Sequence, residues 1–527
     1  MTELASLLLA AATGHVLARL LRLPLIPVLL VVGKVVALAG WGASADFARH
    51  LLELGVAFLV FAAGMELHAA RFKGQRGSTA TLALGQFCGL GLVGFLAARS
   101  LGFELGPSLY LAVAIGTSST FLAVRQLRRQ EAMTEPVGRL VTGALLVQDL
   151  IIVGALIALA GLPEGWVWVA TYAGATAALL ALGLLGRRFV LPWLIMGRDL
   201  DDEVLLLVVV AVLFGFVGAA SWLGLPLAAG GFVAGLTLAR FPLNGLARGQ
   251  LTSLTDFFVA LFFVVLAGSI ELTGLGQLWR ALALVAVIVI VAPPLVTWLA
   301  QRSGLCTRAA LEAGLTLAQG SEFALVVGLV GLKLGHLDAA LFSLIALVTS
   351  LSMMLNPFFA RESLVNRLLH WHPFFASDAE PPKGHVLVLG FGAAGMWVVK
   401  PLRAAGHEVL VIDDDPAVIG LLERQGIPCL RGDAADRRVL TMAGAPNAKL
   451  VLVATRRARD AEAVIKRLPG VPVIVRVFED TDAKRIEAAG GTAVLNSLAA
   501  ADTFMAWWES RTNGFTEGRG ANGGGAR

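Results

Sequence analysis

The sequence predicts a polytopic α-helical membrane domain followed by a Rossmann-like, doubly wound α/β domain, and three observations lead to this fold class. The 527 residues are 57% hydrophobic and only 15% charged, whereas soluble domains have roughly 45–50% apolar and about 25% charged residues. Charged residues are scarce in the first two thirds of the chain and frequent from about Pro381 onward. A G-x-G-x-x-G motif directly follows a short apolar run at residues 385–389. The composition therefore divides the chain into at least two parts.

Thirteen apolar runs in the first part are long enough to cross a bilayer, which takes about 20 residues per helix. The first, at the N-terminus, lacks a basic leader and leads straight into the second, so it is interpreted as a span and not as a signal peptide. The predicted spans are 4–21, 25–42, 52–69, 79–97, 107–124, 139–161, 166–185, 203–221, 224–240, 256–271, 280–299, 309–332 and 338–360.

The loops between these spans predict the orientation. With the N-terminus outside, sixteen Lys and Arg residues fall in cytoplasmic connections and four fall outside. This bias follows the positive-inside rule and, with an odd number of spans, places the C-terminus in the cytoplasm. The same loop cations account for the pI near 9.4, so the basic charge does not by itself indicate nucleic-acid binding. We expect an integral protein of the bacterial inner membrane.

The strongest functional signal inside a span is the pair Gln148-Asp149, in the middle of the sixth apolar run. A bare carboxylate in hydrocarbon is costly, so this Asp should either hold a proton or bind a cation. A group that does one or the other in turn has the chemistry of an exchanger. The alternative is a neutral, structural Asp that is hydrogen-bonded to a neighbouring helix.

Two other spans carry polar interruptions. The fifth contains Gly116-Thr-Ser-Ser-Thr120 and the twelfth contains Gln319-Gly-Ser-Glu322. Such residues let a helix unwind and present oxygen atoms and helix ends to an ion, although Ser and Thr clusters also join packed helices. If spans 1–6 and 8–13 are two inverted repeats, the fifth matches the twelfth, and the Asp149 span matches the last one, with Thr349-Ser350. The predicted ion and proton site comprises Asp149, Gln148, Ser118, Ser119, Thr120 and Glu322.

The second part begins after a linker at 361–384 and is predicted to fill 385–510, with a disordered tail at 511–527. The run from His385 leads into Gly390, Gly392 and Gly395, and the next strand, from Glu408, ends in Asp413. This is a strong dinucleotide-binding motif: a strand, the three glycines, a helix, and an acidic residue about 20 positions after the glycines. The glycines let the backbone approach phosphate at the helix N-terminus.

Asp413 is expected to accept hydrogen bonds from ribose hydroxyls and to repel a 2′-phosphate. This favours NAD(H) or AMP over NADP(H) and leaves open which of these adenine nucleotides binds. Further strand-like runs at 428–433, 450–455 and 471–477 alternate with helices, as in a doubly wound sheet. The predicted nucleotide site comprises Gly390, Gly392, Ala393, Ala394, Gly395, Asp413, Asp414, Asp433, Ala434 and Thr455.

These motifs resemble the Kef-type members of the monovalent cation:proton antiporters, in the order typical of that family. The resemblance rests on residues 54–67, Ser118-Ser-Thr, Gln148-Asp, residues 257–264 and residues 319–324. The second part resembles the Trk/Kef N-type nucleotide-binding regulatory domain (RCK domain), including Gly432-Asp-Ala. The resemblance implies that Asp149 alternates between cation and proton, that the protein is a homodimer, and that nucleotide controls transport. The pair Gln148-Asp149, where other members of the family have Asp-Asp, resembles the pair found in the potassium-preferring, electroneutral branch of these antiporters.

The chain differs from that family at three places. The glycine-rich exit from the second span is replaced by Val31-Val-Gly-Lys34. Many relatives carry a Lys in the span matching 280–299, where this chain has Val291-Ala-Pro-Pro, so no basic partner for Asp149 is expected there. The acidic loop through which glutathione-gated members are inhibited is not evident in residues 243–250. We therefore do not expect glutathione to control transport by this chain.

The sequence thus predicts a secondary antiporter that exchanges K⁺, or Na⁺, for H⁺ by alternating access. A nucleotide-gated cation channel is a second possibility, although no Thr-Val-Gly-Tyr-Gly filter is present. A membrane oxidoreductase is a third, but the nucleotide fold leaves no room for a substrate domain and the spans lack the His pairs that haem needs. The cysteines Cys88, Cys306 and Cys429 are too far apart in sequence for a metal motif. No enzymatic activity and no metal beyond the transported cation are expected.

Overall fold

The computed structural model describes most of the chain and divides it into two compact units, each of which is treated separately below. The described residues are 2–66, 76–130, 132–133, 135–161, 165–190, 202–239, 245–271, 275–305, 307–359, 364–365, 382–392, 395–455, 458–495, 501, 504–505 and 508. The membrane unit comprises Met1–Arg129, Val137–Ser303 and Ala310–Arg367, and the α/β unit comprises Gln130–Pro136, Gly304–Ala309 and Leu368–Arg527. The predicted tail at 511–527 and most of the linker lie outside the described residues.

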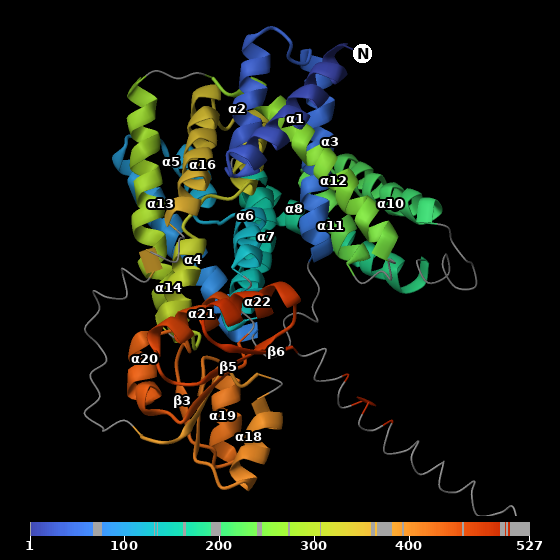
Figure 1. Ribbon diagram of the computed structural model, residues 1–527. Coiled ribbons are helices and arrows are strands. Elements are labelled where there is room, and N and C mark those ends of the chain that lie inside the picture. Colours follow the sequence, from blue (N-terminus) through green and yellow to red (C-terminus); the bar gives the residue numbers. More distant parts are fainter. Residues whose placement is uncertain are drawn as a thin grey trace, which may run out of the picture. The chain divides into compact units, whose positions relative to one another are not determined.

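The membrane unit is entirely helical in its described part (Figure 1). Among the described residues, ten segments are long and apolar enough to cross a membrane, and three shorter apolar helices, Leu25–Leu38, Leu227–Leu238 and Phe323–Lys333, lie in three further predicted spans. The third span begins earlier than predicted, at Ala45. The helices are α1 Thr2–Leu20, α2 Leu25–Leu38, α3 Ala45–Glu66, α4 Arg76–Ser100, α5 Leu105–Ile115, α6 Thr120–Arg129, α7 Pro136–Gly161, α8 Trp166–Leu185, α10 Asp202–Trp222, α11 Leu227–Leu238, α12 Gly245–Leu266, α13 Leu275–Arg302, α14 Thr307–Thr316, α15 Phe323–Lys333 and α16 Ala339–Phe359.

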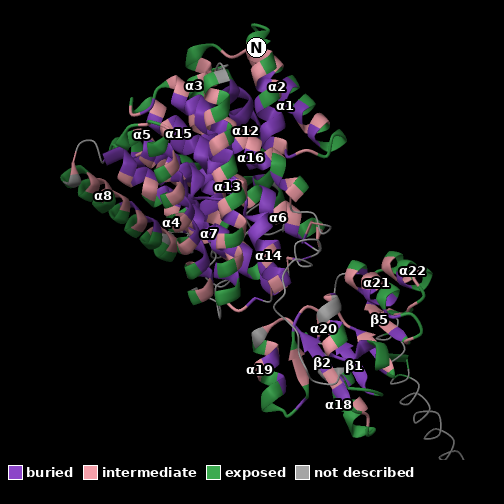
Figure 2. Cartoon of the chain, turned by 90° about the vertical axis from the view of Figure 1, so that its left-hand side faces the viewer, coloured by how far each residue is buried: buried purple, intermediate pink, exposed green. Residues whose placement is uncertain are grey.

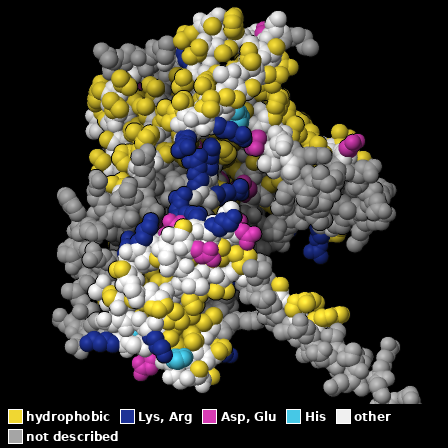
Figure 3. All heavy atoms as spheres, in the orientation of Figure 1, with side chains coloured by type: hydrophobic (Ala, Val, Ile, Leu, Met, Phe, Trp, Pro, Cys, Tyr) yellow, Lys and Arg dark blue, Asp and Glu magenta, His cyan; other side chains and the backbone are white. Residues whose placement is uncertain are grey.

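The surface of the membrane unit is apolar, as a bilayer requires. Figure 3 shows hydrophobic side chains covering most of its visible, described surface. Figure 2 shows exposed residues along α8 and many buried residues in α12 and α16. Large side chains such as Val167, Leu207 and Trp222 remain exposed. Since lipid tails are as apolar as these side chains, this exposure is the expected condition of a spanning helix.

The helices of the membrane unit form two bundles. In the first, α3 packs against α11 and α12, α2 against α1 and α12, and α11 against α8 and α10. In the second, α4 packs against α5 and α13, and α15 against α5 and α16. We call α1–α3, α8 and α10–α12 the frame bundle, and α4–α7 with α13–α16 the crossing bundle.

Glycines permit very close helix contacts in the frame bundle. A Cβ atom added at Gly33 would lie 2.3 Å from the carbonyl oxygen of Val264, and one at Gly235 would lie 2.2 Å from that of Phe61. Gly55 similarly faces the ring of Phe262. Small residues at such crossings let backbones approach and gain van der Waals contact, which is the main attraction between helices in lipid.

The α/β unit contains a parallel six-stranded sheet in the order β3-β2-β1-β4-β5-β6. The strands are β1 Val386–Leu389, β2 Val409–Asp413, β3 Cys429–Arg431, β4 Leu450–Val453, β5 Val473–Val477 and β6 Thr492–Leu495. The helices are α18 Gly395–Ala404, α19 Pro416–Arg424, α20 Arg437–Met442, α21 Ala458–Arg467 and α22 Asp480–Ala488. The doubly wound prediction is confirmed, and β6 is a strand that the sequence did not reveal, since its burial alternates and it has no continuous apolar run.

Candidate functional site

Both predicted interruptions are breaks between two short helices. The first separates α5, which ends at Ile115, from α6, which begins at Thr120; the second separates α14, which ends at Thr316, from α15, which begins at Phe323. The polar residues of both breaks are buried, among them Ser118, Ser119 and Gln319. A buried break leaves backbone groups without helical partners, so other atoms must satisfy them.

Ser118 joins the two breaks. Its hydroxyl donates to the carbonyl oxygen of Leu317 at 2.6 Å, and its backbone N–H donates to Oε1 of Gln148 at 3.1 Å. Nε2 of Gln86, on α4, donates to the Ser118 hydroxyl oxygen at 2.7 Å. Because the single hydroxyl proton is used on Leu317, Gln86 must present its NH₂ group to Ser118, which fixes the orientation of this amide.

Asp149 lies in the middle of α7 with 1% of its surface exposed. The Thr120 hydroxyl donates to its two carboxylate oxygens at 3.2 and 3.4 Å. The carboxyl groups of Glu322 and Glu66 act on it through space. Among the described residues, no Lys, Arg or His forms an ion pair with Asp149. A buried carboxylate without a cationic partner requires a proton or a bound cation.

Glu322 is a second buried acid at the same place. It is 4% exposed and precedes the first residue of α15, where the helix dipole favours negative charge. Its Oε1 accepts a hydrogen bond from the backbone N–H of Phe121 at 3.4 Å, and the side chain of Ser119 also bonds to it. Glu322 therefore connects the start of α15 to the start of α6.

Four buried oxygen atoms in this region have no hydrogen-bond partner among the described residues: Oε1 of Gln86, Oε1 of Gln319, Oε2 of Glu322 and Oδ1 of Asn356. An unsatisfied buried acceptor costs free energy unless water or a cation fills the gap. Neutral amide and carboxyl oxygens are the ligand type that alkali cations take. The donor set is therefore chemically suited to a dehydrated monovalent cation.

The second break is supported by α16, at residues that sequence reasoning missed. Ser352 Oγ accepts from the Gly320 N–H at 3.0 Å, and Asn356 Nδ2 donates to the Leu315 carbonyl at 2.9 Å. The sequence comparison of the two halves pointed instead to Thr349-Ser350. Gln86 was also missed. Ser352, Asn356 and Gln86 could each have been noticed as a polar side chain in an otherwise apolar span. Burying such a side chain in a membrane is costly unless it has a partner.

In the α/β unit, the glycine-rich loop bends around the carboxylate of Asp413. The backbone N–H groups of Phe391 and Gly392 donate to its Oδ2 at 2.7 and 3.4 Å, and that of Asp415 donates to Oδ1 at 2.8 Å. Asp413 thus joins the ends of β1 and β2. Gly390 has φ of +74°, and a Cβ there would lie 2.8 Å from Cγ2 of Thr455.

The predicted nucleotide residues meet at the carboxyl edge of the sheet. Gly390 follows β1, Asp413 ends β2 and Asp414 follows it, Asp433 and Ala434 follow β3, and Thr455 follows β4. The chain continues in one direction from β1 to β2 and in the other to β4, so this edge is the topological switch point, where doubly wound folds bind ligands. Gly395 is the first residue of α18, whereas Ala393 and Ala394 lie outside the described residues.

Asp414 has an unusual environment at this edge. It is half-buried, and burial raises the pKa of its carboxyl from an ordinary value of 3.8 to about 7, with further contributions from Asp413, Asp433 and Asp415. Like charges close together disfavour ionisation. The edge can therefore gain or lose a proton near neutral pH.

A membrane unit with two broken helices that meet beside a buried, unpaired Asp is the architecture of a secondary ion transporter. Residues 4–362 match the sequence model of the family described as "Sodium/hydrogen exchanger, transmembrane", and residues 386–497 match that of the TrkA-N domain. The chain belongs to the sodium/hydrogen exchanger family and carries a TrkA-N domain, which confirms the resemblance to Kef-type cation/proton antiporters with an RCK domain.

Similar proteins extend over nearly the whole chain. It is 27% identical over 514 residues to YbaL of Escherichia coli, whose name describes a cation/proton antiporter; the match covers 92% of this chain and 89% of YbaL. It is 27% identical to the glutathione-regulated potassium-efflux system protein KefC of Salmonella schwarzengrund, over 85% of this chain and 75% of KefC. The sodium proton antiporter MjNhaP1 of Methanocaldococcus jannaschii has a similar fold, with a TM-score of 0.54 and 19% identity over 70% of this chain and 99% of that chain.

Proposed function

We propose that this protein exchanges K⁺ for H⁺ by alternating access, with Asp149 as the alternating carrier. The observation that carries the proposal is the burial of Asp149 beside both helix breaks, with a hydroxyl and no described cationic side chain as its hydrogen-bonding partner. When Asp149 is protonated it is neutral and stable in a dry site. When it loses the proton, it attracts a cation that the oxygens around the breaks can help to hold. One carboxyl exchanging one cation for one proton moves no net charge.

The preference for K⁺ is part of the proposal, and Na⁺/H⁺ exchange is the alternative. Gln148 stands next to the carrier and uses its Oε1 to accept from Ser118, so it adds no negative charge. A site with one carboxylate and several neutral oxygens has a weaker field than a two-carboxylate site, which favours the more easily dehydrated K⁺. The second buried acid, Glu322, fits this proposal if it stays protonated.

The test is cation-driven proton flux in proteoliposomes, for the wild-type chain and Asp149→Asn, with K⁺ and Na⁺ supplied in turn. Wild type should dissipate a pH gradient on addition of K⁺, and Asp149→Asn should not. Asp256→Asn is the matched control, because Asp256 is an exposed acid on α12 of the frame bundle. Retained exchange in Asp149→Asn would contradict the carrier role, and K⁺ conductance without proton flux would favour the channel.

We further propose that the α/β unit binds an adenine nucleotide, AMP or NAD(H), and that binding regulates exchange. The glycine loop, the N-terminus of α18 and Asp413 support this proposal. Regulation requires that nucleotide bind one transport state better than the other. Titration of the full-length protein with AMP, NAD⁺, NADH and NADPH should give saturable binding for at least one of the first three and weaker binding for NADPH. Equal affinity for NADPH would contradict the assigned role of Asp413.

The oligomeric state of the protein and its orientation in the membrane can be tested separately. We propose a homodimer in the bacterial inner membrane, as the resemblance to Kef-type antiporters implies. We propose that the N-terminus lies outside and the C-terminal domain in the cytoplasm, because the loop cations follow the positive-inside rule. A fluorescent reporter fused after the C-terminus should be quenched only by reagents that reach the cytoplasm. Native mass measurement in detergent should give twice the chain mass of 55.2 kDa.

A further inference from the structure

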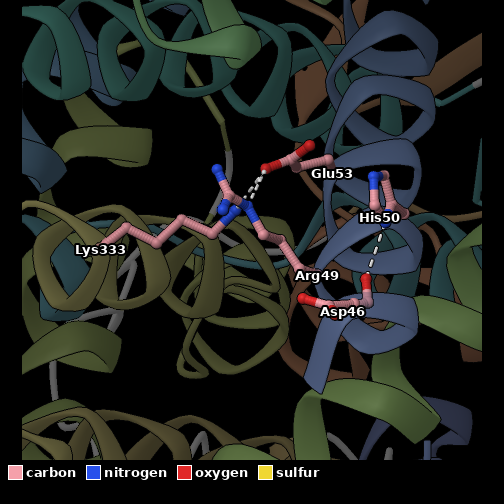
Figure 4. Close-up of polar contacts among 5 residues, drawn as sticks. All are labelled: Asp46, Arg49, His50, Glu53 and Lys333. Carbon is pink, nitrogen blue, oxygen red and sulfur yellow. Dashed lines mark hydrogen bonds and ion pairs between the residues drawn. The ribbon is translucent and has the colours of Figure 1, made fainter. Parts of the chain in front are cut away.

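In the part of the chain that the structure describes, one ion pair connects the two bundles of the membrane unit (Figure 4). Nζ of Lys333, the last residue of α15, lies 3.2 Å from Oε1 of Glu53 on α3. Lys333 therefore belongs to the crossing bundle and Glu53 to the frame bundle. Arg49 lies 3.3 Å from the same Glu53 oxygen, but it is one turn away on α3 itself. Of these two ion pairs to Glu53, the Lys333 pair joins the two bundles and can oppose movement of one against the other, whereas the Arg49 pair cannot.

A second contact between the bundles lies at the same end of the membrane unit. The backbone N–H of Glu271, which follows α12, donates to Oγ of Ser343 near the start of α16 at 2.8 Å. Lys34 of α2 donates to the neighbouring Ile270 carbonyl at 2.5 Å, which ties this segment to the frame bundle. Since α15 ends and α16 begins here, both contacts close one end of the junction between the bundles. The predicted orientation places this end outside.

We infer that the Lys333–Glu53 pair is a latch that holds the outer end closed and must separate in every transport cycle. This inference rests on the alternating-access exchange proposed above. A carrier with a single site must close one side before the other opens, and contacts that differ between the two states set the balance between them. The pair belongs to the state with the outer end closed, because separating the bundles at this end pulls the two side chains apart.

The exposure of the pair suits this role. The side chains of Lys333 and Glu53 are 39% and 30% exposed, so water screens the attraction and the pair contributes modestly. A modest pair biases the equilibrium without preventing the transition. A deeply buried pair at this position would be costly to break in every cycle.

Loss of the latch should change binding from the outer side. Lys333→Gln increases the fraction of protein that is open outside, and apparent affinity rises with that fraction. The outer K⁺ concentration at half-maximal exchange should fall, by up to about fivefold for a surface pair. Arg49→Gln is the matched control, because it removes an ion pair to the same Glu53 that lies within one helix, and the half-maximal concentration should not change. The exchanged pair Lys333→Glu with Glu53→Lys should restore the wild-type value.

The decisive experiment is reversible tethering in the full-length chain with Cys88, Cys306 and Cys429 replaced by serine. Glu53→Cys and Lys333→Cys are joined with a short bifunctional thiol reagent in proteoliposomes. Exchange should fall at least about tenfold, since the bundles can no longer separate at this end, and should return on reduction. In the control, Arg49→Cys with Glu53→Cys, tethering joins two turns of α3 and exchange should continue.

Two results would overturn the latch. The first is full exchange by the chain tethered between positions 53 and 333. The second is an unchanged half-maximal K⁺ concentration in Lys333→Gln. This result is the deciding one in the case that the cysteine variants are already inactive before tethering. If the cysteine-free parent does not exchange but the wild type does, the serine replacements have damaged the protein. The half-maximal K⁺ concentration of Lys333→Gln then decides whether the pair is a latch. Lack of exchange in wild type counts against the proposed function itself.

Discussion

The hydroxyl of Ser118 and the carbonyl of Leu317 are separated by 199 residues in sequence and form a hydrogen bond of 2.6 Å. This bond joins the break between α5 and α6 to the break between α14 and α15. The two half-helix pairs are therefore one connected structure. If a cation binds beside Asp149 as proposed above, this bond is the direct connection through which the first break could act on the second.

Gln86→Leu should weaken cation binding more than it slows exchange. The substitution keeps the volume of the side chain but removes the donor to Ser118 and a buried oxygen that has no described partner. We expect the K⁺ concentration at half-maximal exchange to rise by about tenfold, as loss of about 1.4 kcal/mol would produce, and the maximal rate to change less. Thr142→Val is the control, because the Thr142 hydroxyl donates to the Gly138 carbonyl within its own helix, α7. Equal loss in both variants would show that Gln86 is merely structural.

Glu322→Gln should retain exchange, whereas Glu322→Ala should lose it. Two carboxyl groups that act on each other in a dry site cannot both ionise around one monovalent cation, so Glu322 is expected to stay protonated. Glutamine keeps an oxygen to accept from the Phe121 N–H, and alanine does not. Proton flux in proteoliposomes distinguishes the two. Loss of exchange in Glu322→Gln, or dependence of the wild-type rate on membrane potential, would mean that Glu322 also carries charge.

Asp414 should make nucleotide binding dependent on pH near neutrality. Its carboxyl has a pKa of about 7, well above the ordinary 3.8. The protonated form is thus favoured in the folded domain, and the stability it contributes is complete below pH 3.8 and lost as the pH rises through about 7. An anionic pyrophosphate adds to the repulsion, so the affinity for NAD⁺ should fall between pH 6 and pH 8.

Calorimetric titration of the full-length protein with NAD⁺ at pH 6 and pH 8 tests this dependence. Asp414→Asn should bind with equal affinity at both values, because it has no proton to lose. Glu423→Gln removes an exposed acid of α19 and should keep the wild-type dependence. A pH dependence that survives in Asp414→Asn would assign the titration to another group.

Gly390→Ala should disrupt the nucleotide loop. Gly390 has a positive φ, and its Cβ would meet Thr455 at 2.8 Å. A non-glycine residue in this conformation costs about 1–3 kcal/mol, and the contact with Thr455 adds to that cost. We expect weaker nucleotide binding and a lower melting temperature of the α/β unit. Gly420→Ala on α19, where an added Cβ would meet nothing within 4 Å, should have neither effect.

The sequence was sufficient to predict the architecture, and it also pointed to residues that the structure places together at the two helix breaks and at the sheet edge. Apolar runs of about 20 residues predict spans because the bilayer demands that length, and Gly390 with Asp413 predicts the switch point because few other folds use that spacing. Gln86, Ser352 and Asn356 could not be assigned roles in advance. Each bonds to a backbone or side-chain group far away in sequence, and only the folded chain reveals which distant group is the partner.

The glycine contacts of the frame bundle have a practical consequence for any study of motion. Where Gly33 meets Val264 and Gly235 meets Phe61, the backbones already touch, so these helices can neither approach further nor slide without collision. Probes attached to α3, α11 and α12 should therefore keep constant mutual distances throughout the cycle. They provide a fixed set of coordinates against which the displacement of α15 can be measured.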